Sequence, residues 1–333
     1  MSTESSSDEA VVIWGEVLWD RFPDGDQLGG APANVAWHLG LAGGWARLVT
    51  RVGDDELGRR ALSRLSELVD TSLVQRDGER ATGEVGVAIE AGEPRYTLHP
   101  GRAWERITCT GAVREALAEA GVLVYGTLAQ RTPEGLAGWR DAIRAAGPTC
   151  LKVCDVNLRR TAGGFPAITP RAGGPARPRA PLAEEQVALA EALEAADVVK
   201  VNDRELDAIA RWRGWSDPIT ALRERWPIDP GRSAAHPRAD GRRLVVVTHG
   251  AAGSTLYGES GPLEIAGVPA APGGDNVGCG DAYVAILVLG MTMGWDLATS
   301  GRAASRWAAA VAGARGATPR FTDAQIATLL EPV

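Results

Sequence analysis

Residues that cross-link a chain or bind metals are sparse in these 333 residues. The four cysteines are Cys109, Cys150, Cys154 and Cys279, and the four histidines are His38, His99, His236 and His249. The cysteine spacing fits no disulfide framework and contains no C-x-x-C pair, so we expect reduced thiols. The histidines form no H-E-x-x-H or other paired ligand spacing, which argues against a structural zinc site.

Long apolar runs and basic blocks are also missing from the sequence. No segment approaches 18 uninterrupted apolar residues, and residues 1–10 (MSTESSSDEA) have neither the basic start nor the apolar stretch of a signal peptide. We therefore expect a cytoplasmic protein without a membrane partner, disordered over residues 1–10. The net charge of -7, the pI near 5.3 and the lack of a Lys/Arg-rich block predict no nucleic-acid partner.

What the chain does contain is an alternation of short apolar runs with longer helix-like stretches, at 45% hydrophobic residues. This alternation predicts one doubly wound α/β domain over residues 11–333, with a mostly parallel sheet flanked by helices. The expected strands are 11–15, 47–52, 122–126, 151–156, 198–202 and 244–249. The expected helices are 35–41, 57–69, 112–120, 134–146, 184–195, 298–312 and one that begins near Asp281.

Two segments, about 16–31 and 83–107, break this rhythm. The first is rich in turn residues, and the second alternates around a Gly-Glu-Pro turn without a helical pattern. Together they predict a small β-sheet lid over the main domain. Residues 161–181 and 229–241 are dense in Pro, Gly, Arg and Ala, and we expect surface insertions there.

The most informative short motif is GGDNVGCGD at residues 273–281, which leads into an apolar helix. The N–H groups of Gly278, Cys279 and Gly280 would belong to the unpaired first turn, where they and the helix dipole form an anion site. Asp281 beside such a site suits proton acceptance from a hydroxyl that attacks a phosphoryl group. The alternative is that Asp281 simply caps the helix.

Two common nucleotide-binding signatures do not occur in the sequence. It contains no G-x-x-x-x-G-K-[ST], and G-C-G-D-A-Y fails the dinucleotide-binding pattern at its last glycine. These absences disfavour a conventional P-loop enzyme and a dinucleotide dehydrogenase.

Five motifs can be read together along the chain. They are GGAPANVAWHLGLAGGWARLVTRVGDDELGR (29–59), DVNLR (155–159), KVNDRE (200–205), VVVTHGAAGS (245–254) and DNVGCGDAY (275–283). In this order they resemble the ribokinase-like sugar kinases, the phosphofructokinase B (pfkB) family, over a stretch from Val11 to about Phe321. The resemblance implies a ribokinase-like fold and a kinase that uses ATP.

On the phosphate side, the resemblance makes Asp281 the base that deprotonates a primary hydroxyl of the sugar. It makes Gly278, Cys279 and Gly280 the anion hole. Asn202 and Glu205 would organise Mg²⁺ and the ATP phosphates, largely through water. The alternative for this last pair is a helix cap and its partner three residues later.

Further positions are implied for the nucleotide and for a cation. Thr248, Gly250 and Gly253 would line the nucleotide site, although this stretch could be only a strand-ending turn. Asp275, with the backbone at Val277 and Gly316, would form a site for a monovalent cation such as K⁺.

On the sugar side, Asp20, Gly30 and Asn34 fall where the family holds substrate hydroxyls. A carboxylate suits a vicinal diol, and glycines permit close approach to a sugar ring. The alternative for the glycines is a tight turn into the following helix. Weaker substrate candidates are Arg102, Gln130 and Arg159. For the two arginines the alternative is a solvated or structural ion pair.

The C-terminal motif departs from the family pattern DTxGAGD at several positions. Asn276, Val277 and Cys279 stand where Thr, Thr or Val, and Ala are usual, and Tyr283 replaces Phe. Asp281 and its neighbouring glycines remain, so the departures concern the shape of the site. At Cys279 the helix dipole favours the thiolate and Asp281 opposes it, and we expect comparable effects and a modestly reactive thiol.

The sequence therefore indicates an ATP-dependent sugar kinase. The stretches WGEVLWD, LGGAPAN, GTLAQR and DVNLR look like those of bacterial fructokinases, which makes fructose the favoured acceptor. The alternatives are another sugar, sugar-acid or nucleoside kinase of this family, or a sugar-binding regulator that kept the fold without catalysis. The resemblance also leaves open a homodimer formed through the lid.

Overall fold

The computed structural model describes residues 10–22, 25–90, 93–158, 183–224 and 243–332. The segment expected to be a disordered N-terminus lies outside these residues except for its last position. The two expected insertions, 161–181 and 229–241, and the substrate candidate Arg159 lie outside them as well.

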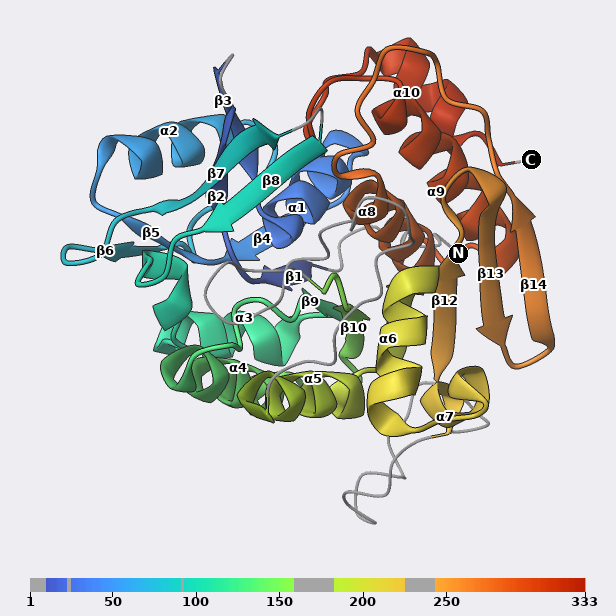
Figure 1. Ribbon diagram of the computed structural model, residues 1–333, viewed down its shortest axis with the longest axis horizontal. Coiled ribbons are helices and arrows are strands. Elements are labelled where there is room, and N and C mark those ends of the chain that lie inside the picture. Colours follow the sequence, from blue (N-terminus) through green and yellow to red (C-terminus); the bar gives the residue numbers. More distant parts are fainter. Residues whose placement is uncertain (1–9, 23–24, 91–92, 159–182, 225–242, 333) are drawn as a thin grey trace, which may run out of the picture.

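Eight strands form the main sheet, in the order β14-β13-β12-β11-β10-β9-β1-β4 (Figure 1). The parallel strands are β1 (Val11–Trp14), β4 (Ala46–Val49), β9 (Val122–Tyr125), β10 (Leu151–Asp155), β11 (Val198–Asn202) and β12 (Leu244–Thr248). An antiparallel pair that the apolar runs did not predict, β13 (Gly253–Gly258) and β14 (Gly261–Ala266), extends one edge. The mostly parallel sheet is confirmed.

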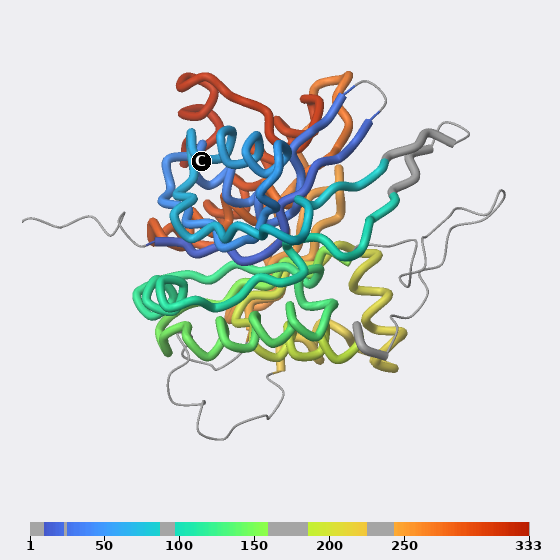
Figure 2. The backbone as a smooth tube through the Cα atoms, turned by 90° about the vertical axis from the view of Figure 1, so that its left-hand side faces the viewer, coloured from blue at the N-terminus to red at the C-terminus, as the bar shows by residue number. Residues whose placement is uncertain are grey.

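Helices cover both faces of this sheet, which is why its strands are apolar on both sides (Figure 2). One face packs against α1 (Ala31–Leu41), α2 (Glu56–Leu65), α8 (Cys279–Thr292), α9 (Leu297–Ala312) and α10 (Asp323–Leu330). The other packs against α3 (Gly111–Glu119), α4 (Pro133–Ala145), α5 (Ala183–Ala195), α6 (Asp203–Arg213) and α7 (Pro218–Arg223). The doubly wound arrangement is confirmed.

The strand expected over residues 47–52 is two strands in different sheets. β4 ends at Val49, and β5 (Arg51–Gly53) pairs instead with β6 (Gln75–Asp77) in a separate two-stranded sheet. The carbonyl of Thr50 accepts a hydrogen bond from the Gln75 N–H, which draws the chain away from the main sheet at that residue.

The expected lid contains a four-stranded sheet in the order β3-β2-β7-β8. Its strands are β2 (Leu18–Phe22), β3 (Gly25–Gly29), β7 (Gly83–Glu90) and β8 (Glu93–Leu98). In Figure 2, β7 and β8 extend away from the body of the molecule. The second lid segment was expected to be free of helix up to residue 107, and this was wrong: Ala103–Arg106 is a turn of 3-10 helix with Trp104 buried in the core.

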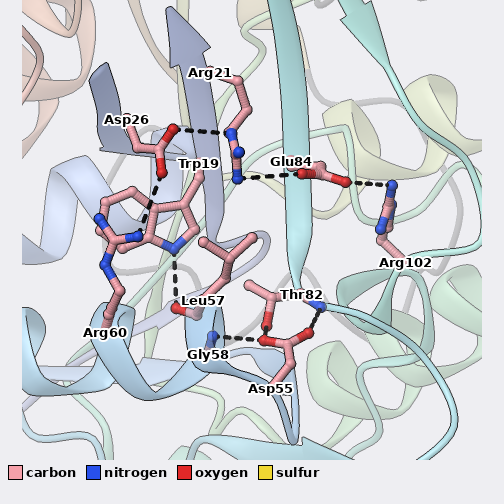
Figure 3. Close-up of polar contacts among 10 residues, drawn as sticks. All are labelled: Trp19, Arg21, Asp26, Asp55, Leu57, Gly58, Arg60, Thr82, Glu84 and Arg102. Atoms are coloured by element: carbon pink, nitrogen blue, oxygen red, sulfur yellow. Dashed lines mark hydrogen bonds and ion pairs between the residues drawn. The ribbon is translucent and has the colours of Figure 1, made fainter.

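The lid sheet is joined to α2 at its base (Figure 3). The Asp55 carboxylate accepts hydrogen bonds from the Gly58 N–H at 2.8 Å and from the Thr82 N–H and hydroxyl at 2.7 Å each. Trp19 Nε1 donates to the Leu57 carbonyl at 3.0 Å. These bonds hold the start of β7 and the strand β2 against the first turn of α2.

No helix in the described ranges is both long enough and apolar enough to span a bilayer.

Candidate active site

Helix α8 begins earlier than expected, and this changes the position of its acid. Gly278, in the left-handed region at φ 77°, is the N-cap, and the helix runs from Cys279. Asp281 is therefore the third helical residue, so the alternative that it caps the helix is wrong. No side chain caps this helix end, which leaves the first-turn N–H groups available to an anion.

Asp281 lies at the buried end of α8, with 4% of its surface exposed. Residues 282–290, which follow it in the helix, are also buried, and this burial explains why the run after the acid is apolar. Asn34 of α1 donates from Nδ2 to Oδ2 of Asp281 at 2.7 Å. The expected base and an expected sugar-binding residue thus meet, although 247 residues separate them in sequence.

Lys200 belongs to the same buried group, and the sequence analysis assigned it no role. Its Nζ lies 2.9 Å from Oδ1 of Asp155 on the neighbouring strand β10. Burial alone would lower the pKa of Lys200, but the carboxylates of Asp155, Glu205 and Asp281 outweigh burial and hold that pKa above its ordinary value. The sequence feature that could have pointed to Lys200 is a lysine within an apolar strand, in a chain whose other basic residues are nearly all arginine.

Asn202 and Glu205 form a capping box at the start of α6, as the structural alternative predicted. Asn202 Oδ1 accepts from the Glu205 N–H at 3.0 Å, and Glu205 Oε2 accepts from the Asn202 N–H at 2.9 Å. Glu205 Oε1 accepts from the Leu158 N–H at 2.9 Å. Burial raises the pKa of Glu205 against the opposing charge of Lys200. A carboxylate has further lone pairs, so contact with hydrated Mg²⁺ remains compatible with these bonds.

Thr248, Gly250 and Gly253 lie together where β12 ends and β13 begins. Residues 250–252 form a 3-10 turn, and Gly253 adopts φ 104°. A Cβ at Gly253 would lie 2.1 Å from the Ile265 carbonyl oxygen, so glycine is required there for packing. The strand-ending turn is what the geometry contains, and a nucleotide role for it stays a prediction.

The three residues expected to bind a monovalent cation are brought together. Asp275 accepts from the Val277 N–H through Oδ1 at 3.1 Å and from the Gly316 N–H through Oδ2 at 2.8 Å. Asp275 thus joins the loop before α8 to the loop after α9. Oxygen ligands from a carboxylate and the main chain suit a hard cation. Clusters of three or more acidic, histidine or cysteine side chains placed for a metal do not occur within the described residues.

Near the sugar-side glycines the space is filled by the protein itself. Gly30 is the N-cap of α1 at φ 101°, and a Cβ on it would lie 2.4 Å from the Glu16 carbonyl oxygen. A Cβ on Gly29 would lie 2.5 Å from Oδ2 of Asp20. These glycines therefore serve the tight entry into α1, in agreement with the structural alternative, and they place Asp20 on β2 beside that turn.

The weaker sugar candidates have structural partners. Arg102 Nη2 forms an ion pair with Glu84 Oε1 of β7 at 2.8 Å, and Glu84 also contacts Arg21 (Figure 3). Gln130 donates from Nε2 to the Gly126 carbonyl at 2.7 Å, while its buried Oε1 has no partner among the described residues. Ligand contact by Arg102 or Gln130 remains a prediction.

The thiol of Cys279 differs from expectation. Burial first, and then the charges of Asp281 and Asp275, raise its pKa to about 11. The expectation was that the helix dipole and Asp281 would have comparable, opposite effects on the thiol. It was wrong because burial of the thiol, which raises the pKa further, is not visible in the sequence pattern.

His38 is a second residue that the sequence analysis missed. It lies one turn after Asn34 on α1 and is fully buried, and its Nε2 is 2.8 Å from the Ala317 carbonyl. Trp307 Nε1 donates to its Nδ1 at 3.2 Å, so the ring is neutral with its proton on Nε2. A Cβ on Gly278 would lie 2.7 Å from Ala317 Cβ, so His38 helps position the segment that packs on the start of α8.

Known proteins resemble this chain over nearly its whole length. A family model described as pfkB family carbohydrate kinase matches residues 25–170 and 171–324. A fructokinase from Escherichia coli is 27% identical over 295 residues, covering 85% of this chain and 84% of that protein.

Two solved structures share the fold. A fructokinase from Xylella fastidiosa with bound ATP has a TM-score of 0.75 at 20% identity, covering 96% of this chain and 98% of that one. A fructokinase from Vibrio cholerae O395 in a fructose, ADP and calcium ion bound form has a TM-score of 0.74 at 22% identity. That match covers 98% of this chain and 100% of the other.

Proposed function

The chain belongs to the pfkB family of carbohydrate kinases, and on that premise we propose that it phosphorylates the 6-hydroxyl of D-fructose with ATP. As a carbohydrate kinase it is a phosphotransferase that acts on a sugar hydroxyl. The choice of fructose rests on the sequence motifs of residues 14–20, 28–34, 126–131 and 155–159. The Escherichia coli relative and the fructose-bound Vibrio structure support it.

The observation that carries the proposal is the pairing of Asp281 with Asn34 at the uncapped end of α8. In the proposed reaction the sugar oxygen attacks the γ-phosphorus of ATP, and the bond from that phosphorus to the β,γ-bridging oxygen breaks. Asp281 takes the proton of the hydroxyl, and ADP leaves. The N–H groups of Cys279 and Gly280 would stabilise charge on the transferring phosphoryl group.

Asn34 contributes by orienting the base. Its Nδ2 donates a hydrogen bond to Oδ2 of Asp281 and so holds the carboxylate in one orientation. Asn34 Oδ1 is itself buried without a partner among the described residues, so it offers an acceptor to a second sugar hydroxyl. Asp20, on the lid strand β2, would accept from hydroxyls at the opposite end of the sugar.

We further propose that Mg²⁺ contacts the capping box of Asn202 and Glu205 through water, where it would neutralise phosphate charge. A monovalent cation would lie at Asp275, Val277 and Gly316, beside the start of α8. In both places the chain supplies oxygen donors, which suit these ions.

A coupled assay of ADP release with a panel of acceptors tests the function. We expect turnover with fructose to exceed turnover with ribose, adenosine and a sugar acid. Preference for one of those acceptors would assign the chain to a different kinase of the family. Sugar binding without ADP release from any acceptor would favour the non-catalytic regulator.

A further inference from the structure

The chain has two lysines, Lys152 and Lys200, and the second is buried beside the proposed phosphate site. Lys200 lies on β11 with 5% of its surface exposed, and Asp155, its register partner on β10, is 3% exposed. Burying an ammonium group is costly unless it has partners. The ion pair of 2.9 Å with Asp155 is such a partner, and it holds the ammonium in one place.

The ammonium group of Lys200 lies against the first turn of α8. A Cβ built on Gly280 would lie 2.8 Å from Nζ, so glycine at residue 280 allows the ammonium to lie this close to the helix. Gly280 is the second residue of the helix, and its N–H belongs to the unpaired first turn. A fixed positive charge and a helix N-terminus therefore adjoin at one point.

Lys200 has hydrogen-bonding capacity that its protein contacts do not use. An ammonium group carries three N–H donors. Among the described residues, the bond that Nζ donates is the one to Asp155 Oδ1. A buried donor without an acceptor is unfavourable, so the donors of Lys200 that no described residue accepts favour a further acceptor, such as a bound anion.

The charge around Lys200 indicates what such an acceptor would be. Asp155 forms an ion pair with this ammonium at 2.9 Å, and the acids Glu205 and Asp281 also act on it electrostatically. A phosphoryl group in transfer spreads negative charge over three equatorial oxygens. The cation of Lys200 would offset the repulsion between that group and the surrounding acids.

We propose that Lys200 is a further catalytic residue, which donates a hydrogen bond to an oxygen of the phosphoryl group during transfer. This role rests on the proposed function, because it requires phosphate at the start of α8. Asp155 is then a positioning residue, which acts by fixing the ammonium.

The test compares Lys200→Met with the matched control Lys152→Met. Lys152 Nζ donates to the Cys150 carbonyl at 2.9 Å, so the control also removes a largely buried ammonium. This one lies at the end of β10 opposite to Asp155. We expect K200M to lower kcat by about 10²- to 10³-fold, as loss of one transition-state donor does, with KM for fructose little changed. K152M should keep the wild-type kcat.

A binding measurement separates catalysis from folding. MgADP with aluminium fluoride mimics a phosphoryl group in transfer, whereas MgADP alone lacks it. K200M should weaken the binding of MgADP with aluminium fluoride by about 10²-fold or more, and it should leave the binding of MgADP alone unchanged. Equal weakening of both, in a variant that melts far below wild type, would assign Lys200 a structural role and overturn the proposal.

A second substitution tests the contact without removing the charge. Gly280→Ala keeps the backbone N–H but presses its Cβ on Nζ of Lys200, so we expect kcat to fall. K200M removes the Nζ atom that this Cβ would contact. The double variant G280A/K200M should therefore be no slower than K200M alone. Additive losses would contradict the contact, and the G280A result decides the matter if K200M does not fold.

The outcomes distinguish this role from the proposed function. Wild-type enzyme that phosphorylates a sugar, with K200M equally fast, would refute the role of Lys200 alone. A K200M variant with unchanged kcat but a raised KM for fructose would also overturn it, because the ammonium would then contact the sugar. If the wild-type enzyme does not release ADP with any of the acceptors, the proposed function and this role are both refuted.

Discussion

Asn34 Nδ2 lies 2.7 Å from Oδ2 of Asp281, and this bond joins the first helix of the chain to the start of α8. Both side chains are buried, so the bond is not exchanged with bulk water and fixes the orientation of the carboxylate. A base held in this way is aligned before the substrate arrives, which lowers the cost of reaching the transition state.

The first prediction concerns the base. Asp281→Asn should lower turnover by roughly 10²- to 10⁴-fold, because an amide does not accept the proton. Its oxygen can still accept from Asn34, so fructose affinity by calorimetry should stay within a few-fold of wild type. Turnover close to wild type would remove Asp281 from the chemistry.

The second prediction concerns the lid acid. Asp20→Ala should raise KM for fructose by about 10- to 100-fold, since leaving hydroxyls unpaired costs about 1–3 kcal/mol. Asp26→Ala is the matched control, because Asp26 lies on β3 of the same sheet, where it pairs with Arg21 of β2 and with Arg60 of α2 (Figure 3). If both variants raise KM equally, the effect comes from damage to the sheet.

The third prediction concerns motion of the lid. A kinase must exclude water from its phosphoryl donor, so the sheet of β2, β3, β7 and β8 should close over bound sugar. Hydrogen exchange in β7 and β8 should slow when fructose is saturating, and β13, on the edge of the main sheet, serves as the reference. Exchange that stays the same in both regions would argue against a lid.

The fourth prediction follows from the pKa of about 11 at Cys279. Only the thiolate is alkylated, and at pH 8 it is about a thousandth of the total. Labelling by iodoacetamide should therefore be slow, should accelerate up to about pH 11, and should be blocked by MgATP with fructose. Cys109 provides the internal reference for reagent activity. Cys279→Ala should remain active, because the backbone N–H carries the role.

If mass spectrometry finds Cys279 labelled equally with and without ligands, and the labelled enzyme still turns over, the phosphate binds elsewhere.

The fifth prediction concerns acid stability. Burial lowers the pKa of His38 from 6.5 to about 4, although its bond to Ala317 opposes this. Between these values the unfolded chain binds a proton that the folded chain does not, so stability is lost as pH falls from 6.5 towards 4. At about 1.4 kcal/mol per pH unit, the loss approaches roughly 3 kcal/mol.

Denaturant unfolding at several pH values measures this slope. His38→Gln keeps a donor for the Ala317 carbonyl and should remove this contribution to the slope, whereas the control His249→Gln should retain it. A slope that is the same in wild type and H38Q would show that another group is responsible.

Some features were predictable because they depend on neighbours in sequence. The apolar runs of β1, β9, β10, β11 and β12 predicted the parallel strands, since burial on both faces selects apolar residues at every position. The capping box of Asn202 and Glu205 was predictable as one of two readings. Its N-x-x-E pattern suits both a cap and a metal site, and only the folded structure shows that each carboxylate oxygen of Glu205 accepts a backbone N–H.

By itself, the sequence determined that an acid follows Gly-x-Gly at the start of an apolar helix, because helix starts and glycine conformations are set within a few residues. Only the tertiary structure decided which charges share the buried space behind that helix. Asp155 and Lys200 meet through strand register, and Asn34 reaches Asp281 across 247 residues. Coulomb energy and desolvation depend on distance through space and on burial, and local sequence patterns encode neither.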